Sequence, residues 1–380
     1  MGISEPRDLE AVRDGLTRWV RWWRPEWRDV DLAPVAQPAT GLSSETIFVE
    51  ADWRPGSGPG APTEHGSWVV RLPPNGEGLF PHYDLAMQGR LQSVLARAGV
   101  PAVAPLAVEE DPSWVGAPFL VMPRVAGRVV RADKPYLRTG WLADAAPEGQ
   151  ARLHREVVDA LARIHRLDWE SLDIATVLST RIGGGPAPSV EAAAAVESPS
   201  SVEAAPGPGW LAGEVEHWAR YLAWAGEDTV PAVFDEGVQW CGANLPPHEP
   251  PASLLWGDVQ LGNVLVGEDL GVSAVLDFEM ASIGPAEVDL AWFVVLHDMA
   301  VDRCGGDLPG FPGRAGTIAA YEARLGRPVA DLHWYEAFAA LRSGAILVRA
   351  ARLLARLGVD DSWLTHENPT IELLAGLIGR

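Results

Sequence analysis

Residues 254–292 constrain the fold of this chain more than any other stretch, and they read LLWGDVQLGNVLVGEDLGVSAVLDFEMASIGPAEVDLAW. An apolar run ends in the sequence Trp-Gly-Asp at Asp258, and Asn263 follows five residues later. Two short segments rich in β-branched residues, 264–266 and 272–276, are joined by the turn-rich sequence Gly-Glu-Asp-Leu-Gly. This pattern predicts a β-hairpin that begins just after Asn263.

The predicted hairpin brings four hard oxygen ligands together. Its second strand leads into Asp277, and Glu279 lies two residues further on. With Asp258 and Asn263 on the preceding loop, these side chains offer the carboxylate and amide oxygens that suit Mg²⁺ beside phosphate oxygens. A turn residue or a helix cap is the alternative explanation for any one of them, but it does not account for all four at this spacing.

This spacing resembles the catalytic loop and metal-binding motif of the protein-kinase-like fold. The sequences Trp-Gly-Asp, Leu-Gly-Asn, Leu-Asp-Phe-Glu and Val-Asp-Leu-Ala-Trp are similar to the aminoglycoside phosphotransferase family, especially its uncharacterised bacterial branch called the phosphotransferase family. The resemblance implies an α+β, bilobal protein-kinase-like fold. We expect an N-terminal β-rich, nucleotide-binding lobe with a leading helix at residues 1–122, a hinge at 123–127, and a larger, mainly helical C-terminal lobe at 128–380.

Length and composition agree with a two-lobed globular protein. A chain of 380 residues, 47% of them hydrophobic, can bury a large core and is expected to form two domains or lobes. We find no N-terminal signal pattern and no apolar run of about 18 residues, so we expect no membrane association. The two cysteines, Cys241 and Cys304, make neither a disulfide framework nor a zinc site, which favours the reducing cytoplasm.

The charge of the chain bears on its partners. A formal net charge of −21 argues against a nucleic-acid-binding protein, which needs a basic surface. It suits a cationic substrate, although an acidic surface that only maintains solubility explains the charge equally well. Lys134 is the only lysine, so nearly every basic side chain is an arginine.

The N-terminal segment shows a leading helix and then strands. Apolar residues recur with helical spacing over residues 9–23. A Gly/Ser loop at 40–46 then leads into an alternating strand, and it contains Ser43 and Ser44. In register with the later motif, this loop resembles the family's nucleotide-covering loop, whose N–H groups and hydroxyls lie over phosphates. An ordinary hairpin loop is the alternative. The Gly/Pro-rich residues 54–66 are expected to be exposed.

A predicted strand at 68–72 and a helix at 83–98 follow. The resemblance implies a lysine on this strand that holds the α- and β-phosphates and a glutamate on the helix that pairs with it. This chain has Arg71 and Gln88 at the matching positions. Arginine also binds phosphate, but as a planar fork rather than a point charge. Gln88 can orient Arg71 without neutralising it.

The apolar segment 118–127, Pro-Phe-Leu-Val-Met-Pro-Arg-Val-Ala-Gly, resembles the hinge between the lobes. The resemblance places Met122 at the back of the adenine pocket. It also implies that the Pro123 carbonyl accepts a hydrogen bond from the purine amine and that the Val125 N–H donates one to the ring. Proline suits the first of these positions because only its carbonyl is needed. A plain edge strand ended by a proline is the alternative.

The C-terminal half is predicted to be helical at 151–169, 210–225, 317–325 and 334–357. Residues 183–209 are rich in Ala, Pro, Gly and Ser and are expected to be a mobile insertion. His165 is interpreted as a core histidine rather than a catalytic group. Candidate substrate-contacting residues, each with a surface or core alternative, are Asp235, Glu236, Trp240, His297, Asp298, Asp302 and Arg303.

The resemblance also implies a role for each motif residue. Asp258 would accept the proton of the attacking hydroxyl. Asn263 and Asp277 would hold Mg²⁺, with Glu279 as a further ligand, direct or through water. Asp289 would accept backbone N–H bonds from the catalytic loop. Trp256 stands where the family often has histidine and is expected to keep a structural role.

The activation loop and the Ala-Pro-Glu signature of protein kinases are missing after Glu279. We therefore predict a Mg²⁺-dependent phosphotransferase that transfers the γ-phosphate of ATP or GTP to an alcohol group of a small molecule. The acceptor could be an aminoglycoside, a nucleoside antibiotic, a macrolide or another hydroxylated natural product or metabolite. The alternative is a nucleotide-binding, pseudokinase-like regulator, which the replacement of the Lys–Glu pair favours. The sequence leaves the oligomeric state open.

Overall fold

The computed structural model describes residues 6–37, 43–56, 62–131, 135–179, 209–226, 230–359, 364 and 368–380. The chain divides into two compact units: unit 1 comprises Met1–Ser93 and Val103–Val125, and unit 2 comprises Val94–Ala102 and Ala126–Arg380. Several predicted features lie outside the described residues, namely part of the nucleotide-covering loop (40–42), the centre of the Gly/Pro-rich stretch (57–61), Lys134 and nearly all of the insertion (183–208).

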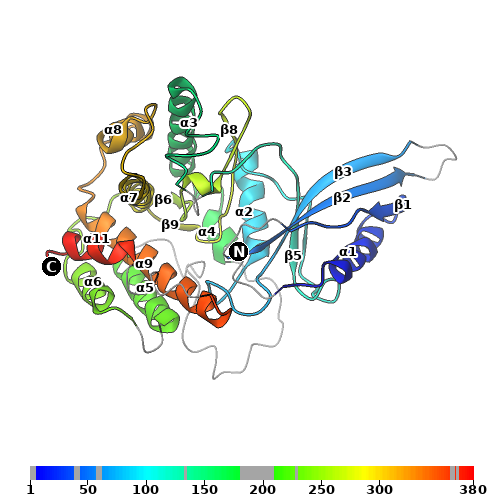
Figure 1. The fold of residues 1–380 in the computed structure, drawn as a ribbon, viewed down its shortest axis with the longest axis horizontal. Coiled ribbons are helices and arrows are strands. Elements are labelled where there is room, and N and C mark those ends of the chain that lie inside the picture. Colours follow the sequence, from blue (N-terminus) through cyan, green and yellow to red (C-terminus); the bar gives the residue numbers. More distant parts are fainter. Residues whose placement is uncertain are drawn as a thin grey trace. The chain divides into compact units, whose positions relative to one another are not determined.

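Unit 1 is built on a five-stranded antiparallel sheet with the strand order β1-β2-β3-β5-β4 (Figure 1). Its strands are β1 (Trp27–Leu32), β2 (Glu45–Pro55), β3 (Glu64–Leu72), β4 (Ala107–Glu109) and β5 (Phe119–Pro123). Its helices are α1 (Leu9–Trp23) and α2 (Leu85–Arg97), the last turn of which belongs to unit 2. The strands and the two helices predicted in this segment are therefore present, at β2, β3, β5, α1 and α2.

Helix α1 covers one face of this sheet. It begins at a capped turn, because the Asp8 carboxylate accepts hydrogen bonds from the backbone N–H groups of Glu10 (3.0 Å) and Ala11 (3.1 Å). Its buried side chains pack with the alternate, inward-facing residues of β2 and β3. Tryptophans fill much of this core, and the rings of Trp27 and Trp53 stack with centroids 4.1 Å apart.

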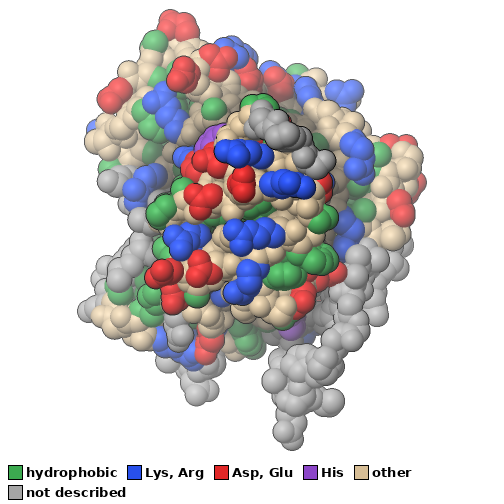
Figure 2. Space-filling view, turned by 90° about the vertical axis from the view of Figure 1, so that its right-hand side faces the viewer, with side chains coloured by type: hydrophobic (Ala, Val, Ile, Leu, Met, Phe, Trp, Pro, Cys, Tyr) green, Lys and Arg blue, Asp and Glu red, His purple; other side chains and the backbone are tan. Residues whose placement is uncertain are grey.

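The β1 edge of the sheet is irregular and charged. A register shift between Arg28 and Asp31 coincides with a positive φ of 51° at Asp29, which marks a bulge in β1. The Asp29 carboxylate pairs with Arg54 of β2 at 3.2 Å. Figure 2 shows acidic and basic side chains interspersed on the face that it presents. A charged and bulged edge disfavours pairing with the sheet of another molecule.

Unit 2 is mainly helical (Figure 1). Its helices are α3 (Pro147–His165), α4 (Ile174–Ser179), α5 (Trp210–Gly226), α6 (Ala232–Ala243), α7 (Glu287–Cys304), α8 (Gly313–Leu325), α9 (His333–Arg356) and α11 (Pro369–Leu377). Helices α5, α6, α7 and α11 all pack against α9, most of whose side chains are buried. The predicted α+β class is confirmed. No helix among the described residues is long and apolar enough to cross a membrane.

Two small antiparallel sheets interrupt the helices of unit 2. One pairs β6 (Ala252–Leu255) with β9 (Ser282–Pro285), and the other pairs β7 (Val264–Val266) with β8 (Val272–Val275). The second pair is the hairpin that the sequence predicts. The turn between β6 and β7 and the segment between β8 and β9 therefore lie at the ends of paired strands, which fixes the backbone of both loops.

Candidate active site

The loop after β6 requires a glycine between Trp256 and Asp258. Gly257 has a φ of +91°, and an added Cβ would lie only 2.1 Å from the Met280 carbonyl oxygen. Any larger residue would therefore push the loop away from the segment that follows β8. The Trp256 indole Nε1 donates to the backbone oxygens of Leu276 (2.8 Å) and Asp277 (3.1 Å), so this tryptophan joins the two loops.

Asp289 in the first turn of α7 holds the same loop from the other side. Its carboxylate is fully buried and accepts hydrogen bonds from the backbone N–H groups of Trp256 (2.7 Å) and Gly257 (3.0 Å). These are the bonds that the sequence analysis expected. His165 Nε2 lies 3.1 Å from the same carboxylate, and its Nδ1 lies 2.5 Å from the Tyr321 hydroxyl. His165 is thus a buried, hydrogen-bonded residue.

Asp258 is surrounded by hydrogen-bond donors. Oδ2 accepts from Asn263 Nδ2 (2.7 Å), and Oδ1 accepts from Trp292 Nε1 (3.0 Å). Gln260 Nε2 lies within hydrogen-bond distance of both oxygens, at 2.9 and 2.8 Å. These donors orient the carboxylate without supplying a formal positive charge. Sequence reasoning missed Gln260 and Trp292, although Trp292 lies three residues after Asp289 and hence on the same side of α7.

The pKa of Asp258 is raised above its ordinary value of 3.8, first because burial penalises the charged form and second because Asp277 is a nearby like charge. The hydrogen bonds from Gln260, Asn263 and Trp292 oppose this shift. A carboxylate with a raised pKa is a stronger base than an exposed aspartate. The site therefore favours proton acceptance by Asp258.

The donor set fits a divalent cation bound with phosphate. Asn263 Nδ2 donates to the Asp258 backbone oxygen (2.9 Å) as well as to its carboxylate, which fixes the amide orientation and leaves Asn263 Oδ1 to act as a ligand. Among the described residues no group of three or more His, Cys, Asp or Glu side chains is arranged to hold a metal ion. Mg²⁺ needs only one or two carboxylates when phosphates and waters complete its shell. Asp277 and the half-buried Glu279 remain predicted ligands.

In unit 1, strand register places two predicted nucleotide contacts on one face of the sheet. Arg71 of β3 pairs with Leu120 of β5, and two residues earlier Val69 pairs with Met122. Side chains two residues apart on a strand point to the same face, so Arg71 and Met122 share a face. The alternate residues, such as Val70, belong to the core that contains α1. The Arg71 face is therefore the one opposite α1.

The other predicted contacts of unit 1 lie around this sheet. Ser43 and Ser44 are buried immediately before β2. Pro123 ends β5, and Val125 lies two residues beyond it. Gln88 is buried on α2. These residues keep their predicted roles as proposals.

Helix α2 holds a second glutamine that the sequence analysis overlooked. Gln92 lies one turn after Gln88 and is also buried. Within the described part of the chain its side-chain oxygen has no hydrogen-bond partner. Gln92 is therefore a further candidate partner for the Arg71 guanidinium.

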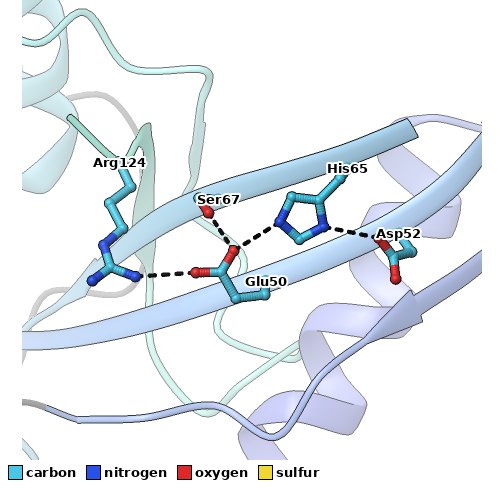
Figure 3. Close-up of polar contacts among 5 residues, drawn as sticks. All are labelled: Glu50, Asp52, His65, Ser67 and Arg124. Carbon is cyan, nitrogen blue, oxygen red and sulfur yellow. Dashed lines mark hydrogen bonds and ion pairs between the residues drawn. The ribbon is translucent and has the colours of Figure 1, made fainter. Parts of the chain in front are cut away.

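A polar cluster extends the Arg71 face outward along β2 and β3 (Figure 3). Glu50 accepts hydrogen bonds from Arg124 Nη1 (3.0 Å) and from the Ser67 hydroxyl, and its other neighbour is His65 Nε2 at 3.1 Å. His65 Nδ1 lies 2.9 Å from the Asp52 carboxylate. The Ser67 hydroxyl lowers the pKa of Glu50, and hydrogen bonding to Asp52 raises the pKa of His65. The cluster therefore favours an ionised Glu50 and a protonated His65.

Arg124 connects this cluster to the predicted hinge. Its backbone N–H donates to the Ser67 carbonyl oxygen (2.9 Å), which extends the β3–β5 pairing by one step. Its guanidinium lies 4.5 Å above the ring of Phe48, the residue of β2 that pairs with Val69. Sequence reasoning missed the cluster, because it depends on the register between strands and not on the spacing within one.

Comparison with known proteins identifies the family of this chain. A model of the phosphotransferase enzyme family (APH) matches residues 34–338. A curated relative, acyl-CoA dehydrogenase family member 11 from Gallus gallus, is 27% identical over 68% of this chain and 27% of its own length. The chain thus spans about a quarter of the curated relatives that it matches.

Two solved structures illustrate the shared fold. A candidate aminoglycoside phosphotransferase from Ralstonia eutropha is 21% identical, with a TM-score of 0.64, over 98% of this chain and 99% of its own. A thermostable mutant of aminoglycoside phosphotransferase APH(4)-Ia, in a ternary complex with AMP-PNP and hygromycin B, is 15% identical, with a TM-score of 0.52, over 96% of this chain and 98% of its own. Both show a kinase-like fold over nearly the whole length. This chain belongs to the phosphotransferase enzyme family.

Proposed function

We propose that this protein is a Mg²⁺-dependent small-molecule kinase that transfers the γ-phosphate of ATP or GTP to an alcohol group. The observation that carries the proposal is the state of Asp258, a partly buried carboxylate with a raised pKa, oriented by Gln260, Asn263 and Trp292. A group held in this way suits the proton-accepting role in phosphoryl transfer.

The proposed reaction assigns each group of unit 2 a task. Asp258 accepts the proton of the acceptor hydroxyl as the hydroxyl oxygen bonds to the γ-phosphorus, while the bond between the γ-phosphorus and its bridging oxygen breaks and the nucleoside diphosphate leaves. Asn263 orients Asp258 through its amide nitrogen, and Asp289 holds the loop backbone. A bound Mg²⁺, held by Asn263 Oδ1, Asp277 and Glu279, would neutralise charge on the phosphate oxygens.

Unit 1 supplies the proposed contacts to the donor nucleotide. Ser43 and Ser44 would cover the phosphates, and Arg71 would bind them as a planar fork oriented by Gln88. Met122 and the backbone of Pro123 and Val125 would contact the purine. The shared face of Arg71 and Met122 supports this assignment, because one nucleotide can reach both.

The first test is Asp258→Asn. We expect turnover to fall by about 10²- to 10⁴-fold, the usual contribution of a general base, with nucleotide affinity nearly unchanged. The wild-type rate should fall at acid pH as Asp258 becomes protonated, at a pH above the ordinary value of 3.8. Asp144→Asn, an exposed aspartate of unit 2, is the matched control. Turnover retained in Asp258→Asn with a confirmed acceptor would refute the assignment.

The acceptor is best sought by thermal-shift screening with Mg²⁺ and a nonhydrolysable nucleotide. The panel should hold aminoglycosides, including hygromycin B, which appears in a related complex. It should also hold macrolides, nucleoside antibiotics and a hydroxylated acyl-CoA, the last because curated relatives are named as acyl-CoA dehydrogenase family members. Hits are then assayed for phosphate transfer.

A nucleotide-binding regulator is the second candidate, which the arginine in place of a lysine on β3 favours. This candidate predicts that the protein binds Mg²⁺-nucleotide but neither hydrolyses it nor transfers its phosphate to any acceptor. Nucleotide hydrolysis measured with and without the screening hits separates the two functions.

A further inference from the structure

We propose that Trp292 and Arg342 form one positioning unit for the Asp258 carboxylate, with Trp292 donating to it directly and Arg342 fixing Trp292. The inference rests on the proposed function, because it concerns the group that would accept the proton. Both residues act through the Asp258 carboxylate and not on the substrate, so both are positioning residues.

Helix α7 holds the catalytic loop at two points. Asp289 binds the loop backbone at Trp256 and Gly257, and Trp292, one turn later, donates its indole N–H to Asp258 Oδ1 at 3.0 Å. The other side chains that donate to Asp258 belong to its own loop and move with it. Trp292 instead links the carboxylate to α7, much of which is buried. Its N–H can donate but cannot accept, so it does not compete for the proton that Asp258 takes up.

Arg342 of α9 fixes the indole ring. Its guanidinium carbon lies 4.8 Å from the centre of the Trp292 ring, and the other two rings around it are Trp218 at 5.1 Å and Phe338 at 5.6 Å. Arg342 is only 4% exposed. A desolvated guanidinium over an aromatic face is strongly held. The ring that donates to Asp258 is thus one wall of a cation-binding cage.

The surroundings of Arg342 show that it does not act as the partner of a carboxylate in an ordinary ion pair. Among the described residues no carboxylate lies within ion-pair distance of it, and its Nε has no hydrogen-bond partner. Its Nη2 approaches the Gly257 carbonyl oxygen at 3.4 Å. The charges that act on it are those of Glu214, Asp289 and Asp258. Arg342 is therefore a buried positive charge near the carboxylates of Asp258 and Asp289.

The decisive variant is Trp292→Phe, which keeps an aromatic ring under Arg342 and removes only the N–H. Losing a hydrogen bond to a charged group should lower kcat by about 10- to 100-fold, with little change in KM or nucleotide affinity.

The chain offers a matched control in Trp334→Phe. Trp334 of α9 is 5% exposed against 3% for Trp292, and its indole N–H also makes one hydrogen bond of 3.0 Å, to the Cys241 carbonyl oxygen. Both variants lose one buried indole hydrogen bond and should lower the melting temperature similarly. Only Trp292→Phe should change kcat.

Arg342 is tested by a pair of substitutions. Arg342→Met removes the charge that holds the Trp292 ring and should lower kcat with little change in KM. Arg342→Lys keeps the charge in the cage and should restore most of kcat. If Arg342→Met and Arg342→Lys have equal kcat values, the cationic part of the proposal is wrong.

A spectroscopic experiment separates this inference from the proposed function. In ¹⁵N-labelled protein the Trp292 indole resonance is the signal that disappears in Trp292→Phe. We expect its chemical shift to move in Asp258→Asn, because its hydrogen-bond acceptor changes, and to stay unchanged in Asp144→Asn. If no acceptor supports turnover but this change is seen, the kinase proposal fails and the positioning unit stands. An indole resonance that ignores Asp258→Asn would overturn the inference.

Discussion

At the scale of single residues, the motif that contains Asp258 and Asn263 matches the pattern expected from the family resemblance. The position on β3 that is expected to hold a lysine does not match it. Asp258 and Asn263 lie in direct contact, and Asp277 acts on Asp258 as a nearby charge. On β3, by contrast, Arg71 stands where the family resemblance predicts a lysine. Arginine binds phosphate bidentately and needs a planar, hydrogen-bonded surrounding. The change is therefore expected to alter how the nucleotide is held more than whether it is held.

The residue-scale prediction concerns Arg71 and Gln88. Arg71→Ala should weaken Mg²⁺-nucleotide binding by roughly ten- to a hundred-fold, since a charge-assisted hydrogen bond contributes about 1.5–3 kcal/mol. Arg71→Lys alone should not restore the nucleotide affinity, because α2 has no carboxylate that could pair with a lysine at this position. The double variant Arg71→Lys/Gln88→Glu should recover more than the single changes add up to. Calorimetric titration of the wild type, Arg71→Lys, Gln88→Glu and the double variant measures this coupling.

The structure adds a control to that cycle. Gln92 lies one turn from Gln88 on α2 and keeps an unpartnered, buried amide oxygen within the described residues. The pair Arg71→Lys/Gln92→Glu therefore tests which glutamine faces Arg71. Purely additive effects in both pairs, or normal binding in Arg71→Ala, would show that Arg71 does not contact the phosphates.

At the scale of elements, the hairpin and the amphipathic helices could be predicted because their signals are local. Residues 264–266 and 272–276 alternate around a turn, and β7 and β8 form there, with β8 one residue shorter. Helices α1, α3, α5 and α9 have apolar stripes of helical period and lie within a few residues of their predicted ranges.

Other elements lacked such a signal. Helix α7 buries both polar and apolar residues in its first turns, from Glu287 through Asp289 to Trp292, so it has no apolar stripe to detect. The cluster of Glu50, His65 and Arg124 depends on the register of β2, β3 and the end of β5. Register follows from pairing between strands, and no single segment specifies it.

The element-scale prediction concerns the contact of α3 with α8. His154 is buried, and its Nε2 lies 2.8 Å from the Thr317 hydroxyl, whose own proton goes to the Gly313 carbonyl oxygen. His154 Nε2 must therefore donate to the Thr317 hydroxyl oxygen. Burial, and then the nearby charge of His297, lowers the pKa of His154 to about 4 from an ordinary 6.5.

The sign of the pH effect follows from these two values. The unfolded chain binds the His154 proton at a higher pH than the folded chain does. The contribution to stability is therefore complete above pH 6.5 and is lost as the pH falls from 6.5 toward 4. Its size is about 3–4 kcal/mol, at about 1.4 kcal/mol per pKa unit. Chemical denaturation at several pH values should show a shallower dependence in His154→Gln, whereas His248→Gln, an exposed histidine, should match the wild type.

At the scale of the whole molecule, ligand binding to either unit is read out as global stability. A ligand that binds only the folded protein stabilises it by about 2.7 kcal/mol at a concentration one hundred times its Kd. The net charge of −21 gives the chain no general attraction for nucleotides. Any stabilisation by ATP or GTP must therefore come from a specific site with its own cations.

The whole-molecule prediction uses this linkage to place the metal. Mg²⁺ with a nonhydrolysable nucleotide should raise the melting temperature of the wild type by more than the nucleotide in EDTA does. Asp277→Ala should abolish the Mg²⁺-dependent part of the increase and leave the EDTA value unchanged, because it removes the proposed principal carboxylate ligand. Asp258→Asn should retain the Mg²⁺-dependent part, since Asp258 is proposed to take up a proton and not to bind the metal. The exposed Asp144→Ala should behave as the wild type. An unchanged Mg²⁺ effect in Asp277→Ala would show that the metal does not bind at the end of β8. The proposed path of the γ-phosphate would then be wrong as well.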